Sequence, residues 1–365
     1  MLNKKRFIST VCIFFFLLIY CGGEAFAQSS FWGKGIGKLL KKADDYLEYS
    51  QMQGVDSSYI GRPDLNRQLY VGTYGYWQHY DLHFPYDDSM DGVRTAKEGS
   101  YYDVNMHAIQ AEMELGIDYK GLAIELPIPL HNLYNFSLGL AKNGSVWGFR
   151  IRYKYMRHMN GSIENTGIRV DTIPDNLNNL KNFFVEGYYV FNNKRFSLAA
   201  GLYSDMIQKR SQGGAFVMGN FSRSIYTGEE LFHGAKEVFR TSQISVGGGY
   251  GYNLVMCNSH LVFHASLIPM FSLYQKVSHS IYDENDIKEE LGIPRDYDYD
   301  SFYNSITGTP KFVVNGFARF ATNYSWDRYL LSLLVNYRQY LYSNDRGFRT
   351  HSREGDAQIN FCVRF

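Results

Sequence analysis

The sequence predicts an all-β fold, a transmembrane antiparallel up-and-down β-barrel of about 12 strands (10–14), preceded by a short N-terminal amphipathic helix. Three observations lead to this prediction. The 365 residues are 45% hydrophobic and 17% aromatic, yet the mean hydropathy is slightly negative, so apolar and polar residues are finely mixed. After residue 27 there is no apolar run of about 18 residues, which leaves a barrel as the way to span lipid. Many segments alternate apolar and polar residues with a period of two, as strands with one wet and one greasy face do.

The first 27 residues have the pattern of a secretory signal peptide. Basic residues at 4–6 precede an apolar run at 7–20, and Ala-Phe-Ala at 25–27 offers a cleavage site. The alternative is a lipoprotein leader acylated at Cys21, but that enzyme needs a small residue where this chain has a tyrosine. We therefore expect residues 1–27 to be cleaved.

Residues 28–66 differ from the rest and are predicted to be a periplasmic amphipathic helix and linker. Apolar residues recur at helical spacing over 31–50, with charged residues between them. The apolar face of this helix needs a cover. Either the helix caps the barrel mouth, or it forms a small plug or a membrane-surface helix, for which it has four lysines: Lys34, Lys38, Lys41 and Lys42.

Residues 67–365 are predicted to form the barrel, and its best-patterned strands carry charges on one face. An Arg or Lys near the bilayer midplane costs about 2–4 kcal/mol, so these charges are predicted to face the lumen. The predicted lumen cluster consists of Glu112, Glu114, Asp118, Glu125, Arg150, Arg152 and Lys154. It forms either a salt-bridge network that closes the barrel or the wall of an ion-selective channel. From their positions alone, Arg152 is expected to pair with Glu114, unless the strand register shifts the pairing to a neighbour.

Thirteen segments qualify as strands, whereas bacterial single-chain barrels have an even number and return both termini to the periplasm. One candidate is therefore wrong, and residues 121–128 and 213–225 are the two suspects. Residues 195–209 are counted as a strand. Long connections, the predicted extracellular loops, lie near 81–103, 159–181, 279–310 and 343–354.

The last ten residues form the clearest final strand. Ala357, Ile359, Phe361, Val363 and Phe365 share one face. This ending resembles the signal that hands outer-membrane barrels to their insertion machinery. Predicted partners are accordingly that machinery, with outer-membrane lipid and lipopolysaccharide, and the predicted location is the outer membrane.

Candidates for chemistry are weak, and no catalytic residue, metal or cofactor is predicted. His264 and Ser266 share a strand face, but their β-carbons lie about 7 Å apart by strand rise, which argues against a direct hydrogen bond. Asp296, Asp298 and Asp300 resemble the start of a calcium loop, although the required Gly and Glu are missing. This loop either binds divalent ions weakly or is simply solvated.

Charge and cysteine content exclude further classes of function. Without the leader, 34 basic and 35 acidic side chains remain, because Lys4, Lys5, Arg6 and Glu24 are removed from 37 and 36. This balance does not attract nucleic acid. Two cysteines remain, Cys257 and Cys362, which allow one disulfide but do not require it.

Three segments resemble a known family. They are Asp56-Ser57-Ser58-Tyr59-Ile60, residues 115–122 and residues 246–253. The chain resembles an uncharacterised family of Gram-negative outer-membrane proteins known as a domain of unknown function. The resemblance implies a barrel and no catalytic residue. The predicted function is a non-catalytic outer-membrane barrel, either a narrow pore or a surface binding or structural protein, and the alternative is a hydrolase of phospholipid or lipopolysaccharide.

Overall fold

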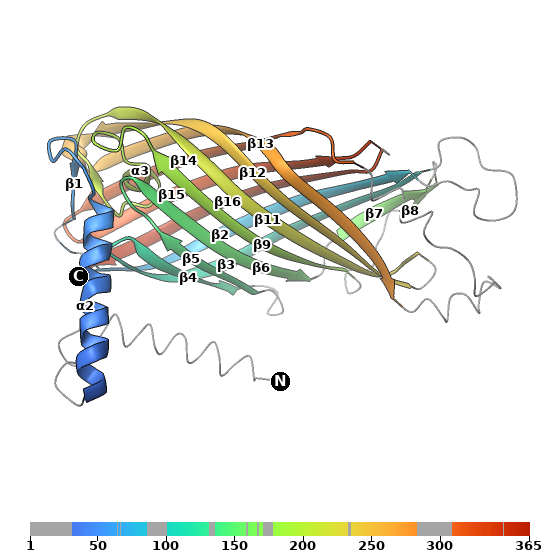
Figure 1. Cartoon of the computed structure of the whole chain (residues 1–365), viewed down its shortest axis with the longest axis horizontal. Coiled ribbons are helices and arrows are strands. Elements are labelled where there is room, and N and C mark those ends of the chain that lie inside the picture. Colours follow the sequence, from blue (N-terminus) through green and yellow to red (C-terminus); the bar gives the residue numbers. More distant parts are fainter. Residues whose placement is uncertain are drawn as a thin grey trace, which may run out of the picture.

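The protein is a closed barrel of twelve antiparallel strands, which confirms the predicted fold class (Figure 1). The computed structural model describes residues 31–63, 65, 67–85, 101–130, 136–157, 160–165, 168–170, 178–232, 235–282, 309–345 and 347–365. The wall consists of β2 (Arg67–Pro85), β3 (Tyr101–Tyr119), β4 (Leu122–Pro129), β5 (Phe136–Lys142), β6 (Trp147–Arg157), β9 (Asn178–Val190), β11 (Gln212–Phe232), β12 (Ala235–Met256), β13 (Leu261–Tyr282), β14 (Val314–Trp326), β15 (Tyr329–Ser343) and β16 (Arg349–Arg364). Each wall strand pairs with the next in this order, and β16 pairs with β2 to close the ring.

In the part of the chain that the structure describes, six short or separate elements accompany the wall. They are α2 (Phe31–Gln51), β1 (Ile60–Gly61), β7 (Asn160–Asn165), β8 (Ile168–Val170), α3 (Leu198–Leu202) and β10 (Ile207–Gln208). A 3-10 turn, η4 (Cys257–Ser259), joins β12 to β13. β7 pairs with residues 102–107 of β3, whereas the short β4 pairs with residues 112–119 of the same strand. β1 pairs with β10. No helix in the described part of the chain is long and apolar enough to cross a membrane.

The barrel has two distinct ends. At the turn end, β2 begins and β16 finishes, and β3 is joined to β4 by Lys120-Gly121. Both turn residues have positive φ, 52° and 79°, as a two-residue hairpin requires. The opposite end is called the loop end. Of the predicted long loops, the connections at 86–100, 171–177 and 283–308 lie outside the described residues, as do Asp296, Asp298 and Asp300.

Two details of the predicted strand assignment are wrong: the candidate that is not a strand, and the length of one loop. Both suspected strands exist, as β4 and β11, and the false candidate is 195–209, which contains α3 and β10. Removing it reverses the direction of β11, so the connection after β11 falls at the loop end. The predicted loop at 343–354 is also too long, because β16 already begins at Arg349.

Segment 195–209 folds into the barrel mouth at the turn end instead of crossing the membrane. Its residues 198–202 are all apolar or glycine, and all are buried. A wall strand needs one wet face, which this run does not have. The N-cap hydroxyl of Ser197 accepts a hydrogen bond from the Ala200 amide at 3.0 Å and starts α3. We call residues 191–211 the plug.

Inward side chains of the described strands fill the lumen in three layers. At the turn end, Phe196 and Leu202 of the plug belong to one apolar cluster with Phe216 of the wall. A charged layer follows. Toward the loop end lies an apolar and aromatic layer that includes Tyr226 and Phe239. The interior of this twelve-stranded barrel is therefore a packed core.

The outward side chains are apolar. Exposed large hydrophobic residues occur on every wall strand from β12 to β16, with Leu331, Val335 and Ile359 as examples. Near the turn end, Trp326 contacts the rings of Tyr329 and Phe361. An apolar surface bordered by aromatic rings is typical of a barrel in lipid.

Neither Cys257 nor Cys362 forms a disulfide. Cys257 is exposed and Cys362 is buried.

The helix expected over 31–50 is α2, and its C-terminal part is fixed to the turn end. Lys120 Nζ lies 2.8 Å from Asp44 Oδ1 and 2.9 Å from Glu48 Oε2. Glu48 also accepts a hydrogen bond from Arg62 at 2.7 Å. At the helix end, the amide of Ser145 donates to the carbonyl of Gln51 at 3.1 Å.

Replacing residues 197–206 by a Gly-Ser linker of equal length should leave the barrel wall intact. β9 and β11 pair directly with each other, so the ladder does not pass through the plug. We expect the β-sheet circular dichroism and the heat-modifiable gel migration to persist, with a lower urea midpoint because apolar contacts are lost. A chain that no longer assembles would contradict the separation of plug and wall.

Acid should loosen α2 from the turn end. Hydrogen bonds from Lys120 and Arg62 lower the pKa of Glu48 from 4.5 to about 2. Because the folded pKa is depressed, this stabilisation is complete above the unfolded pKa of 4.5 and is lost as the pH falls toward 2. A spin label at position 49 should become more mobile over that range. Glu48→Gln should be mobile at all pH values, and the exposed control Asp45→Asn should behave like the wild type; a step that survives in Glu48→Gln would contradict the assignment.

Candidate functional site

The predicted lumen charges are all buried, and all come from strands around one part of the wall. Even-numbered residues of β3 and β6 point inward, which places Glu112, Glu114 and Asp118 opposite Arg150, Arg152 and Lys154. Glu125 reaches the same region from β4. Period-two alternation alone puts these side chains inside, because each strand has only two faces.

Glu125 is the centre of this charged layer. Its Oε1 lies 3.0 Å from Arg150 Nη2, and its Oε2 lies 2.7 Å from Arg152 Nη2. One carboxylate thus neutralises two guanidinium groups, each with side-chain exposure of 9% or less. The pairing of Arg152 with Glu114 expected from position is wrong. The β4–β5 hairpin lies between β3 and β6, so Glu125 lies nearer to the arginines.

Lys154 is held by aromatic groups instead of a carboxylate. Its Nζ donates to the hydroxyl of Tyr74 at 2.6 Å and lies 3.3 Å from the centroid of the Tyr76 ring. Arg152 Nη1 donates to the same Tyr74 hydroxyl at 3.2 Å. The two tyrosines on β2 therefore link both cations, through a hydrogen bond and through cation–π contact.

Two further ion pairs belong to the layer and are missing from the predicted cluster. Arg319 of β14 pairs with Glu186 of β9, and Arg338 Nη1 of β15 lies 2.6 Å from Asp356 Oδ1 of β16. Both pairs are almost completely buried. Glu186, Arg319 and Arg338 are single charges on otherwise uncharged inward strand faces, whereas Asp356 shares the inward face of β16 with Glu354 and Arg364. That pattern is visible in the sequence, but the clusters of three on β3 and β6 are far more conspicuous.

Not all acidic groups in the layer are paired. Both oxygens of Glu114 are buried without a hydrogen-bond partner among the described residues. Glu112 instead accepts a hydrogen bond from Ser137 at 3.2 Å, and Asp118 accepts one from the Gly121 amide at 3.1 Å. Glu114 is therefore the acidic group whose charge the fold least requires.

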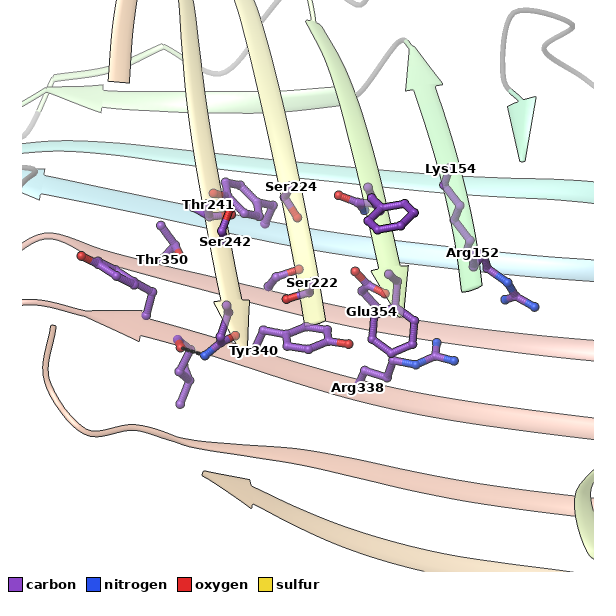
Figure 2. Close-up of a pocket in the computed structure, with 18 of the residues that line it drawn as sticks. Arg152, Lys154, Ser222, Ser224, Thr241, Ser242, Arg338, Tyr340, Thr350 and Glu354 are labelled. Carbon is purple, nitrogen blue, oxygen red and sulfur yellow. Dashed lines mark hydrogen bonds between the residues drawn. The ribbon is translucent and has the colours of Figure 1, made fainter. Parts of the chain in front are cut away.

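A cavity of about 60 Å³ lies between the charged layer and the aromatic layer, and Figure 2 shows its lining. Arg152, Lys154 and Arg338 line one side, and hydroxyl groups line the other: Ser222, Ser224, Thr241, Ser242 and Thr350. Glu354 is also part of the lining. Such a volume accommodates a few water molecules, since one water occupies about 10–15 Å³ by this measure. It is far below the roughly 300 Å³ of common ligand pockets.

The plug is tied to both the charged layer and the wall. The Arg150 guanidinium lies 4.6 Å from the ring centroid of Tyr203, which follows α3. From the wall, Asn323 Nδ2 donates to the Gly201 carbonyl at 2.6 Å, and Arg364 Nη2 donates to the Ser204 carbonyl at 2.9 Å. These bonds satisfy carbonyls at the end of a short helix that would otherwise be buried without partners.

His264 and Ser266 are in direct contact, so the objection based on their spacing is wrong. Asn253 Nδ2 donates to the Ser197 carbonyl and to Gln208 Oε1, so Asn253 Oδ1 accepts from His264 Nδ1 at 2.7 Å. His264 Nε2 is then free to accept from the Ser266 hydroxyl at 3.0 Å. The strand rise separates the β-carbons, but the imidazole ring spans the difference.

This Ser-His-Asn chain has the order of a nucleophile, a base and an orienting group. His264 is fully buried, however, and its ring lies 6.3 Å from the ring of Phe196 of the plug. Ser266 lines neither the cavity of Figure 2 nor a second one, of about 50 Å³, beside Asp118 and Tyr203. The chain therefore joins wall to plug, as a structural hydrogen-bond network does.

The residues of the predicted insertion signal lie at the turn end of β16. Phe361 and Phe365 are 44% and 50% exposed on the outer face, and Val363 is half-buried. The Phe365 amide donates to the Arg67 carbonyl at 3.0 Å, which joins the last residue to the first of β2.

Among the described residues, no group of three or more His, Cys, Asp or Glu side chains could hold a metal ion.

Comparison with known proteins identifies a family. The profile of the family described as "Domain of unknown function (DUF4421)" matches residues 71–365, the whole barrel except the start of β2. The chain belongs to this family. No curated protein matches it.

Solved structures with a similar course of the chain are barrels of several kinds. The outer membrane protease OmpT from Escherichia coli has 8% identity and a TM-score of 0.39, with 83% of this chain and 98% of that chain covered. The translocator domain of the autotransporter NalP from Neisseria meningitidis has 10% identity and a TM-score of 0.33, with 91% and 95% covered. An outer membrane channel from Pseudomonas putida F1 has 9% identity and a TM-score of 0.32, with 84% and 98% covered.

Two matched substitutions test the charged layer. Glu125→Gln leaves two buried guanidinium groups without their carboxylate and should lower the free energy of unfolding by about 3–5 kcal/mol. Glu114→Gln removes a carboxylate without partners and should change it by less than about 1 kcal/mol. Urea titration of the folded protein measures both. Equal losses in the two variants would show that the ion pairs do not stabilise this layer.

Proposed function

We propose that this protein is a non-catalytic outer-membrane barrel with a closed lumen, which serves a binding or structural role at the cell surface. The observation that carries the proposal is the buried ion-pair layer, in which Glu125 joins Arg150 and Arg152 across the interior. With the plug on one side and the aromatic layer on the other, the two cavities beside this layer that the described residues line have volumes of about 60 and 50 Å³. Barrels with an aqueous channel are typically built from about 16–18 strands.

The outer surface supports a place in the membrane. Inward positions are polar or charged in the middle of the barrel, whereas outward positions such as Leu331, Ile359 and Phe361 are apolar and exposed. An exposed apolar band of this kind is expected only where lipid covers it. Because short turns gather on the periplasmic side of such barrels, the turn end and both chain termini are assigned to the periplasm.

Planar-bilayer recording tests the closed lumen. The wild type should insert without steady single-channel current, because ion pairs and plug fill the path. A variant with the plug replaced, with Glu125, Arg150 and Arg152 changed to Ala, and with Tyr226 and Phe239 of the aromatic layer changed to Ala should conduct. Its control is the plug replacement alone, which keeps the ion pairs and should stay closed. Steady ohmic current from the wild type would overturn the proposal in favour of a narrow pore.

The hydrolase alternative rests on one observation, the hydrogen-bonded chain Ser266, His264 and Asn253. The plug covers these three hydrogen-bonded residues, so a lipid acyl group has no path to the Ser266 hydroxyl. The protein should therefore turn over neither phospholipid nor lipopolysaccharide. Activity that is present in the wild type and lost in Ser266→Ala would replace the proposed function with that of a hydrolase.

A further inference from the structure

The helix α2 consists of two parts with opposite charge. The part nearest the barrel contains Asp44, Asp45 and Glu48, whereas residues 31–43 contain four lysines and no acidic residue. The acidic part makes the contacts with Lys120 and Arg62 described above. The cationic part, which we call the overhang (residues 31–43), precedes these contacts and carries an unbalanced charge.

The contacts place α2 at the outer rim of the barrel. Odd-numbered residues of β3 point outward, and Tyr119 is the last of them. Its hydroxyl donates to Asp44 Oδ1 at 2.6 Å. At the other end of the helix, Gln51 Nε2 donates to the Asp205 carbonyl in the plug at 2.8 Å. From Gln51 to Asp44 the helix thus runs from the mouth outward to the lipid-facing side of β3.

The overhang continues in the same direction, past the wall. At 1.5 Å per residue it extends by roughly 20 Å. Figure 1 shows α2 lying across the long axis of the barrel and projecting beyond its edge at the turn end. Because the axis of a membrane barrel lies roughly along the bilayer normal, the overhang runs along the bilayer surface.

The depth of the overhang follows from its neighbours on the wall. Tyr119 pairs with Arg67, and the next outward pair is Ile117 with Leu69, which is 45% exposed. The apolar outer surface therefore begins one pair away from the point where Asp44 is bound. The helix lies at the level where headgroups meet acyl chains.

We propose that the overhang is a membrane-surface helix that binds anionic phospholipid headgroups of the leaflet at the turn end. In sequence, Ile36, Leu39 and Leu40 recur at a spacing that puts them on one side of an ideal helix, and the lysines at 34, 38, 41 and 42 fall on the opposite side. A helix with an apolar face, a cationic face and low net hydrophobicity lies in the interface plane. Lysines near an anionic surface are attracted to it, and a cap on the barrel mouth would not require this charge. The inference rests on the membrane placement proposed above.

Spin-label accessibility in lipid nanodiscs tests the position of the helix. Single cysteines at positions 33–42, in a chain with Cys257→Ser and Cys362→Ser, report access to oxygen from lipid and to a nickel chelate from water. We expect a period of about 3.6, with oxygen access highest at 36, 39 and 40 and nickel access highest at 34, 38 and 41. Uniform access to nickel, or uniform protection by the barrel, would overturn the proposal.

A label at Ile359 separates the two proposals. This outward residue on β16 is 52% exposed and should be accessible to oxygen if the barrel spans the bilayer. Oxygen access at Ile359 with none at 36, 39 and 40 rejects the surface helix alone. No oxygen access at Ile359 rejects the membrane placement itself.

The lipid charge is tested with the same labels. In nanodiscs that contain phosphatidylglycerol, changing all four overhang lysines to Gln should reduce oxygen access at position 39 to the level measured in pure phosphatidylcholine. The matched control changes the same lysines to Arg, which keeps the charge and should retain the wild-type value. Equal access in all three proteins and both lipids would overturn the choice of anionic headgroups.

Discussion

The interior of this barrel depends on one constraint: a buried charge must find a counter-charge across a lumen that contains little water. Desolvation of an ion costs several kcal/mol, and only well-placed partners compensate for it. Glu125 meets this need for Arg150 and Arg152, while Glu186 and Asp356 do so for Arg319 and Arg338. These pairs join β4 to β6, β9 to β14 and β15 to β16, so they tie together strands around the ring. The charged layer thus links strands on different sides of the ring.

The plug completes this arrangement from the turn end. It brings Tyr203 under Arg150, and its backbone carbonyls are bound by Asn323 and Arg364 of the wall. Asn143 also donates to Asp205 at 2.6 Å. Asp205 lies outside the spanning strands, and burial, followed by the nearby Asp118, raises its pKa well above the ordinary value. A carboxyl group that holds its proton more tightly fits a plug that enters a region already rich in carboxyl groups.

The sequence predicts much of the wall, because a strand with one face in lipid and one in the lumen must alternate. Arg150, Arg152 and Lys154 cannot face lipid, so their direction follows from the energy of transfer. Segment 195–209 is different. It carries apolar residues at alternate positions, but the residues between them at 198–202 are apolar or glycine too. Alternation on its own does not distinguish a strand from a short helix that is buried on all sides, and this explains the thirteenth candidate.

The pairing of the charges could not be predicted from the same pattern. Which carboxylate reaches Arg152 depends on how many strands separate β3 from β6 and on the register of each, which a turn of one more residue would change. Glu125 pairs with Arg152 because the β4–β5 hairpin lies between β3 and β6. Glu125, on β4, is therefore closer to β6 than Glu114 on β3 is. Likewise, the spacing of His264 and Ser266 gives the distance between β-carbons but not the reach of an imidazole ring. Period-two patterns therefore determine which face a side chain occupies, whereas contacts inside the lumen depend on side-chain length and strand order, which only the folded barrel specifies.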